Sequence, residues 1–355
     1  LLMGTSSSTA CWTSSHRACV KLKCVPTSAD SPGLGEFELI RQFFASARCA
    51  QASAGVELGI GDDCALLALS AGEQLAVSTD TLVAGVHFPE GADAFLLAQR
   101  GLAAAASDLA AMGAAPLGFT LALTLPAADP VWLRAFAQGL DRMAQLCGLA
   151  LVGGDTTRGP LSLTFTVIGC VPIGQALTRS GAQAGDLLCV GGSLGDAAAA
   201  LPLVLGQASA EPEITQALLA RYWSPEPQLA LGLALRGKAT AALDVSDGLL
   251  ADCAHLATAS AMAVHIDLPR VPIAEQALRF LGERRAQECA LTGGDDYRLV
   301  FSLPPRELQS LQAQWPQVTA IGHIRHGSGV QVFDSSGQQL QLAAGGYQHF
   351  GSTHG

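Results

Sequence analysis

The sequence predicts two consecutive domains, the first of them of the α/β class. Helical and strand patterns alternate between Gly35 and Pro172, and a second series of such patterns starts after Gly174. A chain of 355 residues is long enough for two domains, and with 49% hydrophobic and 14% charged residues it can bury a large core. We therefore expect one domain over residues 35–172 and another over residues 173–350.

The first domain is predicted from two local patterns. Short apolar runs bounded by proline or glycine indicate buried strands, and stretches with a helical apolar period indicate helices. In chain order we expect a helix over Glu36–Phe44, a strand over Gln74–Ser78, a helix over Asp93–Met112, a strand over Leu117–Leu125, a helix over Pro130–Cys147, and strands over Leu149–Val152 and Ser162–Val171.

The second domain shows the same two patterns. We expect strands over Asp186–Val190, Ala239–Leu243, Arg298–Leu303, Thr319–Ile324 and Gly329–Phe333, and helices over Pro225–Arg236 and Leu249–Ala259. A glycine-rich segment over Gly191–Asp196 precedes a further, alanine-rich helix. This segment is either a tight turn or a nest for phosphate, and because it matches neither common phosphate-binding spacing the tight turn is favoured.

The charge balance argues against nucleic acid and membranes as partners. The net charge is −10, and the only lysines are Lys21, Lys23 and Lys238, whereas both partners require clustered basic residues. No apolar stretch approaches the roughly 18–20 residues that span a bilayer. Residues 1–34 are rich in Ser and Thr and lack the apolar core of a secretory signal, so we expect a disordered or spurious extension outside the fold.

The ten cysteines form no C-x-x-C pair and show no zinc-ligand spacing. Reduced thiols in a cytoplasmic protein are the simplest interpretation.

Short acidic motifs with glycine or hydroxyl neighbours give the clearest functional signal. They are Gly59–Cys64, Ser78–Thr81, Ser107–Gly113, Gly153–Gly159, Asp244–Gly248 and Gly293–Tyr297. Carboxylates on tight turns and at strand ends, in a chain otherwise poor in charge, predict a site for several hard divalent cations such as Mg²⁺. Such a site would bind a polyphosphate without a lysine loop.

Most of these motifs also have an ordinary structural explanation. The Asp62-Asp63 pair could accept backbone hydrogen bonds within a turn, and Ser78–Thr81 could form a polar strand end. Ser246 or Asp247 could cap the following helix, and His87 could be a loop histidine.

Two motifs favour function more strongly. Asp108 lies among small apolar residues, where an unpaired acid is costly to bury. Gly153–Gly159 follows a predicted strand, the position at which α/β folds bind ligands. Asp155 could hold a cation there, and Arg158 could contact phosphate or cap the turn. The number of such motifs together favours a metal site.

The motifs in their order resemble the thiamine-monophosphate kinase family from about Gly35 to Phe350. The resemblance rests on Gly35–Phe37, Gly59–Leu67, Ser78–Phe88, Ser107–Gly113, Gly153–Gly159, Leu177–Gly181, Asp244–Leu249, Gly293–Tyr297 and Gly346–Phe350. It implies the fold of the aminoimidazole-ribonucleotide synthetase superfamily, with an N-terminal α/β domain that dimerises, a C-terminal α+β domain, and ATP bound near the dimer interface. It also implies transfer of the ATP γ-phosphoryl group to thiamine monophosphate.

The same resemblance implies roles for individual residues. Those expected to bind Mg²⁺ are Asp63, Ser78, Thr79, Asp80, Asp108, Asp155, Asp244 and Asp247. Those expected to bind the nucleotide are Gly154, Asp155, Arg179 and Ser246. His87, Asp295 and Ala344 are expected to contact the substrate. The acceptor is already an anionic phosphate oxygen, so no residue is expected to act as general acid or base.

The chain departs from the family pattern twice. Similar proteins carry Glu at the position of Asp295, and an aromatic residue where this chain has Ala344. Other ATP-using members of the superfamily, which act in selenophosphate synthesis or hydrogenase maturation, lack support because this chain has no C-terminal cysteine and no reactive cysteine in an N-terminal glycine-rich segment. A metal-dependent phosphohydrolase and a non-catalytic sensor of nucleotides or thiamine phosphates remain as further alternatives.

Overall fold

The computed structural model describes residues 35–51 and 53–340. Its strands are β1 (Val56–Leu58), β2 (Leu66–Leu67), β3 (Glu73–Val83), β4 (Ala115–Leu125), β5 (Ala150–Arg158), β6 (Ser162–Pro172), β7 (Leu187–Val190), β8 (Ala241–Asp244), β9 (Ala263–Asp267), β10 (Leu299–Leu303), β11 (Thr319–Arg325) and β12 (Gly329–Phe333). Its α-helices are α1 (Glu36–Leu39), α2 (Ala94–Ala111), α3 (Pro130–Cys147), α4 (Asp196–Val204), α5 (Pro212–Trp223), α6 (Leu229–Leu235), α7 (Leu249–Ser260), α8 (Glu275–Leu281), α9 (Glu283–Thr292) and α10 (Pro305–Gln314). A π-helix, η1 (Ile40–Ala45), continues α1, and 3₁₀ turns cover Arg48–Ala50 and Leu268–Arg270.

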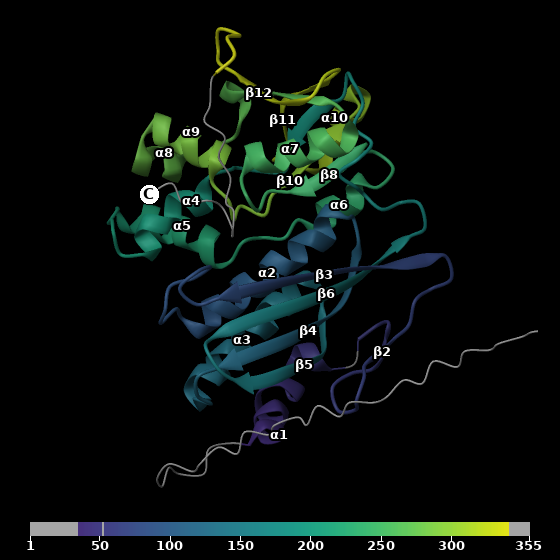
Figure 1. Ribbon diagram of the computed structural model, residues 1–355, viewed down its shortest axis with the longest axis vertical. Coiled ribbons are helices and arrows are strands. Elements are labelled where there is room, and N and C mark those ends of the chain that lie inside the picture. The colour runs from purple at the N-terminus through teal and green to yellow at the C-terminus, as the bar shows by residue number, and fades with distance from the viewer. Residues whose placement is uncertain (1–34, 52, 341–355) are drawn as a thin grey trace, which may run out of the picture. The chain divides into compact units, whose positions relative to one another are not determined.

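The first sheet has the strand order β3-β6-β4-β5, and its strands lie side by side in Figure 1. Helix α2 packs on β3 and β6, and α3 packs on α2. The close approach of the two helices depends on Gly139, because a Cβ there would lie 2.1 Å from the carbonyl oxygen of Phe95. Helix α2 is itself rich in alanine, and Ala103, Ala105 and Ala106 are fully buried.

The residues of β3 alternate between the two faces of this sheet. Ser78 and Asp80 turn toward the partly buried side, while Leu75 and Val77 on the opposite face are 48% and 59% exposed. We expected the strand to stop at Ser78, with the acidic motif after it. That expectation was wrong, because β3 pairs with β6 along its whole length, from Glu73 opposite Pro172 to Val83 opposite Ser162.

Strand β5 also continues beyond its predicted end. We expected it to stop at Val152, yet it runs to Arg158 in parallel pairing with β4. The pairing shifts register between Phe119, opposite Leu151, and the next pair, Thr120 opposite Gly153. Gly154 has φ +155°, and a Cβ there would lie 2.0 Å from the Leu121 carbonyl oxygen, so the glycines allow an irregular strand to continue.

The second sheet has the order β12-β9-β11-β7-β10-β8. All neighbouring strands are antiparallel except β12 and β9. Every residue of β10 is buried, as expected for a strand covered on both faces. Helix α7 packs against β8, β9 and β12, while α6 packs against α2 of the first sheet's layer.

Two helices begin differently from their prediction. Helix α6 begins at Leu229 rather than Pro225, because the residue before Pro227 is disfavoured in helical conformation. Helix α7 is capped neither by Ser246 nor by Asp247, because its N-cap is Gly248. The carboxylate of Asp252 accepts hydrogen bonds from the backbone N–H groups of Ser246, Asp247 and Gly248, at 3.0–3.1 Å. The sequence patterns did not predict β1, β2, β9, α5, α8, α9 and α10.

One hydrophobic cluster contains both Phe165 of β6 and Phe301 of β10. The two sheets and their helices confirm the mixed α and β architecture, whereas the boundary between residues 172 and 173 stays a prediction. Among the described residues, no helix is both long and apolar enough to cross a bilayer.

Candidate active site

Three predicted metal ligands lie together where β3, α2 and β8 meet. Asp80 comes from β3, Asp108 from the last turn of α2, and Asp244 from the end of β8. Ser78 donates a hydrogen bond to the carboxylate of Asp108, and Ser107 donates one to Asp244, with an Oγ–Oδ2 distance of 2.6 Å. Adjacent residues on α2 thus form one hydrogen bond to the first sheet, from Ser78 to Asp108, and one to the second, from Ser107 to Asp244.

Burial and mutual repulsion disfavour the charged form of these acids. Burial, followed by the nearby charge of Asp108, raises the pKa of Asp80 to about 6. Burial and Asp108 likewise raise the pKa of Asp244 to about 7. Burial raises the pKa of Asp108 itself, although the hydrogen bond from Ser78 and the positive charge of Arg179 oppose that shift. A cation at this position would relieve the repulsion.

The segment 293–297 adjoins this acidic cluster. Its backbone is tied to the segment after β8, because the N–H of Asp295 binds the carbonyl of Ser246 at 2.9 Å and that of Tyr297 binds the carbonyl of Val245 at 2.8 Å. The predicted substrate contact Asp295 and the predicted nucleotide contact Ser246 are therefore neighbours. Asp244, at the end of β8, immediately precedes Val245 and Ser246.

His87 lies just after β3, four residues from the end of that strand. Its Nδ1 accepts a hydrogen bond from the N–H of Val83 at 3.0 Å, and its carbonyl accepts one from the hydroxyl of Tyr222 at 3.2 Å. His87 is therefore fixed both by its own loop and by α5.

Asp63 and Asp155 form a separate group. Both line a groove of about 930 Å³ whose walls include Phe37, Phe44 and Leu151. The register of the first sheet shows how far this group is from Asp80. Residues that pair directly across the four strands form a row, and one such row runs from Asp80 through Phe165 and Leu121 to Gly154, next to Asp155. Three strand spacings separate its ends, or about 14 Å.

Asp155 also points to the opposite side of the sheet. It shares a row with the exposed residues Thr81 and Ala122, one position along from Asp80. Neighbouring residues of a strand face opposite sides. Within one chain, the structure does not bring Asp63 and Asp155 to the Asp80–Asp108–Asp244 cluster.

The other predicted ligands are distributed around the first cluster. Thr79 lies on the exposed face of β3, where its hydroxyl shares a hydrogen bond of 2.9 Å with that of Thr166. Arg179 is exposed but close enough to lower the pKa of Asp108. Asp247 is partly buried at the start of α7. Ala344 lies outside the described residues.

The donor chemistry of the cluster suits Mg²⁺, because its groups are carboxylate and hydroxyl oxygens. Within residues 35–51 and 53–340, however, no group of three or more His, Cys, Asp or Glu side chains is arranged to hold one metal ion by itself. Mg²⁺ usually takes one or two carboxylates and completes its shell with water and phosphate oxygens. The aspartates of the cluster therefore fit Mg²⁺ ions that are coordinated jointly by the protein and a bound polyphosphate, and not ions coordinated by protein side chains alone.

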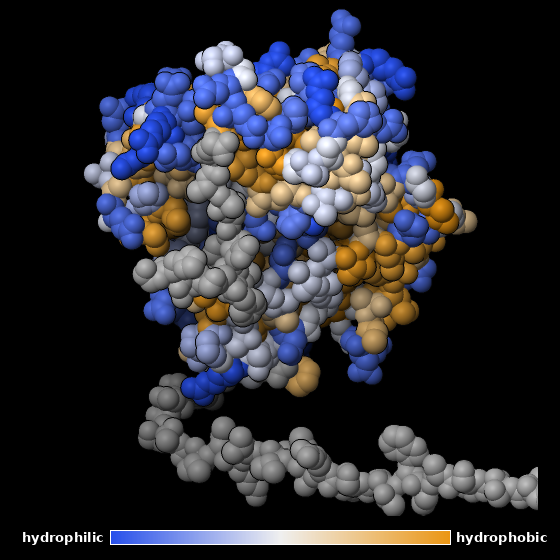
Figure 2. Space-filling model, turned by 45° about the horizontal axis from the view of Figure 1, so that its top comes forward, coloured by the Kyte–Doolittle hydropathy of each residue, from blue (hydrophilic) through white to orange (hydrophobic). Residues whose placement is uncertain are grey.

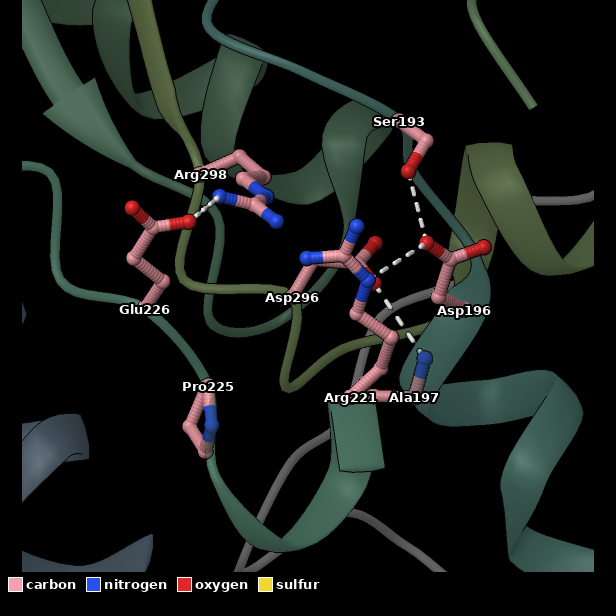
Figure 3. Close-up of a pocket in the computed structure, with 8 residues that line it drawn as sticks. All are labelled: Ser193, Asp196, Ala197, Arg221, Pro225, Glu226, Asp296 and Arg298. Carbon is pink, nitrogen blue, oxygen red and sulfur yellow. Dashed lines mark hydrogen bonds and ion pairs between the residues drawn. The ribbon is translucent and has the colours of Figure 1, made fainter. Parts of the chain in front are cut away.

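The glycine-rich segment before α4 borders a different, smaller pocket, shown in Figure 3. Its volume of about 10 Å³ corresponds to one water molecule, so it is too small for a nucleotide. The carboxylate of Asp296 accepts hydrogen bonds from the N–H groups of Gly195, at 2.6 Å, and Ala197, at 3.4 Å. Since a protein carboxylate occupies these amides, the tight-turn interpretation fits better than a phosphate nest.

Sequence reasoning missed several residues of the site. Ser107 and Tyr297 lie inside motifs that were singled out, but neither was given a role. Arg100 and Tyr222 lie outside every motif, although a lone arginine in an alanine-rich helix was a usable signal. Arg100 is only 2% exposed and forms an ion pair with Asp295 at 2.9 Å.

Comparisons with known proteins agree with this architecture. Residues 61–171 match the family model "AIR synthase related protein, N-terminal domain", and residues 183–335 match "AIR synthase related protein, C-terminal domain". Thiamine-monophosphate kinase of Escherichia coli (strain K12) is 42% identical over 321 residues, which cover 89% of this chain and 98% of that protein.

Solved structures resemble the chain as well. Thiamine-monophosphate kinase from Stenotrophomonas maltophilia K279a has a TM-score of 0.75 and 46% identity, covering 79% of this chain and 91% of that one. The structure "AaThiL complexed with AMPPCP and TMP" has a TM-score of 0.71 and 27% identity, covering 80% of this chain and 89% of that one. With two family models that together match most of its length, and relatives of this similarity, the chain belongs to the thiamine-monophosphate kinase family of the AIR synthase related proteins.

Proposed function

We propose that this chain transfers the γ-phosphoryl group of ATP to the phosphate of thiamine monophosphate, giving thiamine diphosphate. The observation that carries the proposal is the convergence of Asp80, Asp108 and Asp244, from three distant parts of the sequence, beside the backbone of Ser246 and Asp295. A relative of the same fold has been solved in complex with AMPPCP and TMP. AMPPCP is an analogue of ATP, and the abbreviation TMP is consistent with thiamine monophosphate. The relatives named thiamine-monophosphate kinase support the same reaction.

Mg²⁺ is the cofactor that the acidic cluster would hold. When bound, it supplies positive charge to phosphate oxygens that would otherwise be repelled by the aspartates. The protein's contribution is to fix the carboxylates: Ser78 orients Asp108, and Ser107 orients Asp244. Arg179, whose positive charge acts on Asp108, would add a charge-assisted contact to the nucleotide.

No side chain needs to take a proton in this reaction. The attacking oxygen belongs to a phosphate that is anionic near neutral pH, and the leaving group is ADP. The chain therefore acts by holding the two phosphates in line and by balancing their charge. His87 and Asp295 are the proposed contacts to the thiamine part of the substrate.

We further propose that the active form is a dimer, built through the uncovered face of the first sheet. This face carries the exposed apolar residues Leu75 and Val77, and a row of threonines in which Thr81 and Thr164 share a hydrogen bond of 2.9 Å. Figure 2 shows hydrophobic surface gathered in an orange area on the right of that view. A second copy packed on this sheet would cover Leu75, Val77 and the threonine row.

Dimerisation would also explain why the acidic residues fall into two groups. If the two-fold axis runs along the strands, β5 of one protomer lies over β3 of the other. Each site would then combine Asp80, Asp108 and Asp244 of one protomer with Asp63 and Asp155 of its partner. Under this proposal, a single chain contains both groups without a complete site.

The cytoplasm is the proposed compartment. Seven cysteines among the described residues are unpaired, as expected under reducing conditions.

The test is to incubate the purified chain with ATP, Mg²⁺ and thiamine monophosphate, and to separate the products by chromatography. Thiamine diphosphate and ADP should form in equal amounts, and neither should form without Mg²⁺. Release of inorganic phosphate from thiamine monophosphate without ATP would instead identify a phosphohydrolase. ATP binding with no ADP formation would identify a sensor.

A further inference from the structure

Arg100 lies at the centre of a buried network that joins the two predicted substrate contacts. It occupies the middle of α2, where all other residues of the buried face are small, apolar or uncharged, and its side chain is 2% exposed. One guanidinium nitrogen, Nη2, is 2.9 Å from Oδ2 of Asp295. A second nitrogen, Nη1, donates to the carbonyl of Tyr222 at 2.7 Å.

Tyr222 fixes the guanidinium from a second direction. The carbon centre of the guanidinium lies 3.8 Å from the centroid of the Tyr222 ring, which is cation–π geometry. The hydroxyl of Tyr222 in turn donates to the backbone carbonyl of His87. The network therefore runs from Asp295 through Arg100 and Tyr222 to the His87 loop, although the two ends are 208 positions apart in the chain.

The backbone at Asp295 requires such support. Asp295 has φ +70° and Tyr297 has φ +49°, both in the left-handed region that non-glycine residues avoid. The hydroxyl of Tyr297 donates to Oδ1 of Asp295 at 3.0 Å, so Arg100 and Tyr297 together hold both carboxylate oxygens. The next side chain, Asp296, is anchored on the other side of the segment, at the N-terminus of α4.

The Asp295 carboxylate is nevertheless accessible, because 43% of its side chain is exposed while Arg100 behind it is not. An exposed carboxylate held by buried partners is suited to contact a ligand without reorganising. Thiamine carries a positively charged thiazolium ring, so a fixed carboxylate matches the charge of that part of the molecule. The ammonium of a lysine at position 100 would provide one point charge but not the planar fork that reaches Asp295 and Tyr222 together.

We propose that Arg100 is a positioning residue for thiamine monophosphate, which holds the Asp295 carboxylate in place for the substrate while contacting neither ATP nor the transferred phosphoryl group. The inference rests on the proposed function. It assigns a role in substrate affinity to Arg100 of α2, the helix that packs on the first sheet. It also explains why this alanine-rich helix buries a charged side chain.

The experiment compares steady-state kinetics of the full chain with those of Arg100→Met, Arg100→Lys and Tyr297→Phe. Arg100→Met should raise KM for thiamine monophosphate roughly ten-fold or more, as expected for a lost charge-assisted contact, and leave KM for ATP within about two-fold. Arg100→Lys should recover part of the loss, and Tyr297→Phe should raise the same KM to a smaller extent. Arg279→Met is the matched control, because it removes an exposed arginine of α8 whose ion pair, at 2.7 Å, is with Glu211, the N-cap residue of α5, and not with a residue of the network.

Three results would overturn the role of Arg100: an unchanged KM for thiamine monophosphate, equal rises of both KM values, or a loss confined to kcat. If Arg100→Met fails to fold, Tyr297→Phe decides, because it removes one hydrogen bond to Asp295 and leaves no buried charge. A purely structural role would lower Tm without separating the two KM values. Failure of the proposed function is distinguishable, since the unaltered chain would then form no thiamine diphosphate, which would overturn both proposals.

Discussion

Ser107 and Asp244 are 137 positions apart, yet the serine hydroxyl lies 2.6 Å from the aspartate carboxylate and both residues are buried. This hydrogen bond connects α2, which covers the first sheet, to β8, at the edge of the second. It links the packing of the two sheets directly to the acidic cluster. The residues around it provide several tests of the proposed site.

Ser107→Ala should destabilise the protein and weaken its response to Mg²⁺. Loss of the hydroxyl leaves the buried Asp244 carboxylate without this donor, at a cost of about 1–3 kcal/mol in the free energy of unfolding. Chemical denaturation with and without Mg²⁺ measures both effects. Ser310→Ala is the control, because Ser310 makes an exposed hydrogen bond to the Glu307 carbonyl at 3.0 Å. Equal stability of the two variants would contradict a structural link through Ser107.

The stabilisation by Mg²⁺ should depend on pH. The pKa values of Asp80 and Asp244 rise from an ordinary value of 3.8 to about 6 and about 7 in the folded protein without metal. The folded state therefore binds protons more readily than the unfolded state, and these two groups reduce stability as pH rises through the interval between 3.8 and about 7. Mg²⁺ binds the ionised carboxylates and offsets this loss, so the increase in Tm on adding Mg²⁺ should be larger at pH 8 than at pH 6. The control is Na⁺ at matched ionic strength, and an increase independent of pH would be evidence against the cluster as the metal site.

Asp80→Asn and Asp155→Asn should each abolish turnover, and mixing the two inactive variants should restore activity. If a site takes Asp80 from one protomer and Asp155 from its partner, a mixed dimer retains one intact site. Random reassociation makes half of the dimers mixed, so about a quarter of the original activity should return. Co-refolding followed by the thiamine diphosphate assay measures this. Two inactive variants that stay inactive when mixed, despite forming mixed dimers, would show that each chain builds its own site.

Val77→Glu should dissociate the proposed dimer. The substitution places a charge on the uncovered face of the first sheet, where burial against a second copy would be costly. Light scattering after size-exclusion chromatography reports the mass. Val131→Glu serves as the control: Val131 is 75% exposed, compared with 59% for Val77, but it lies at the start of α3 and off the sheet face. A dimer that survives Val77→Glu and not Val131→Glu would place the interface elsewhere.

The sequence by itself determined the family and most of the regular elements. Local apolar periodicity locates α2, α3 and the buried strands β4, β6 and β10, because each of these elements buries a continuous face or stripe. It also provided the acidic residues of the candidate site, since carboxylates next to glycine and hydroxyl residues stand out in a chain with few charges. Strand ends were less predictable: β3 and β5 continue through Asp80 and Asp155 because their partners supply backbone hydrogen bonds that no local pattern records.

Only the tertiary structure decided which acidic residues meet. Asp80, Asp108 and Asp244 converge because α2 packs between the first sheet and β8, whereas Asp155 lies three strands away on the other face. The same packing buries Arg100 against Tyr222 and brings it to Asp295. Residue spacing along a chain does not encode such distances, because they depend on the sheet order and on side-chain faces that are fixed when the layers pack together.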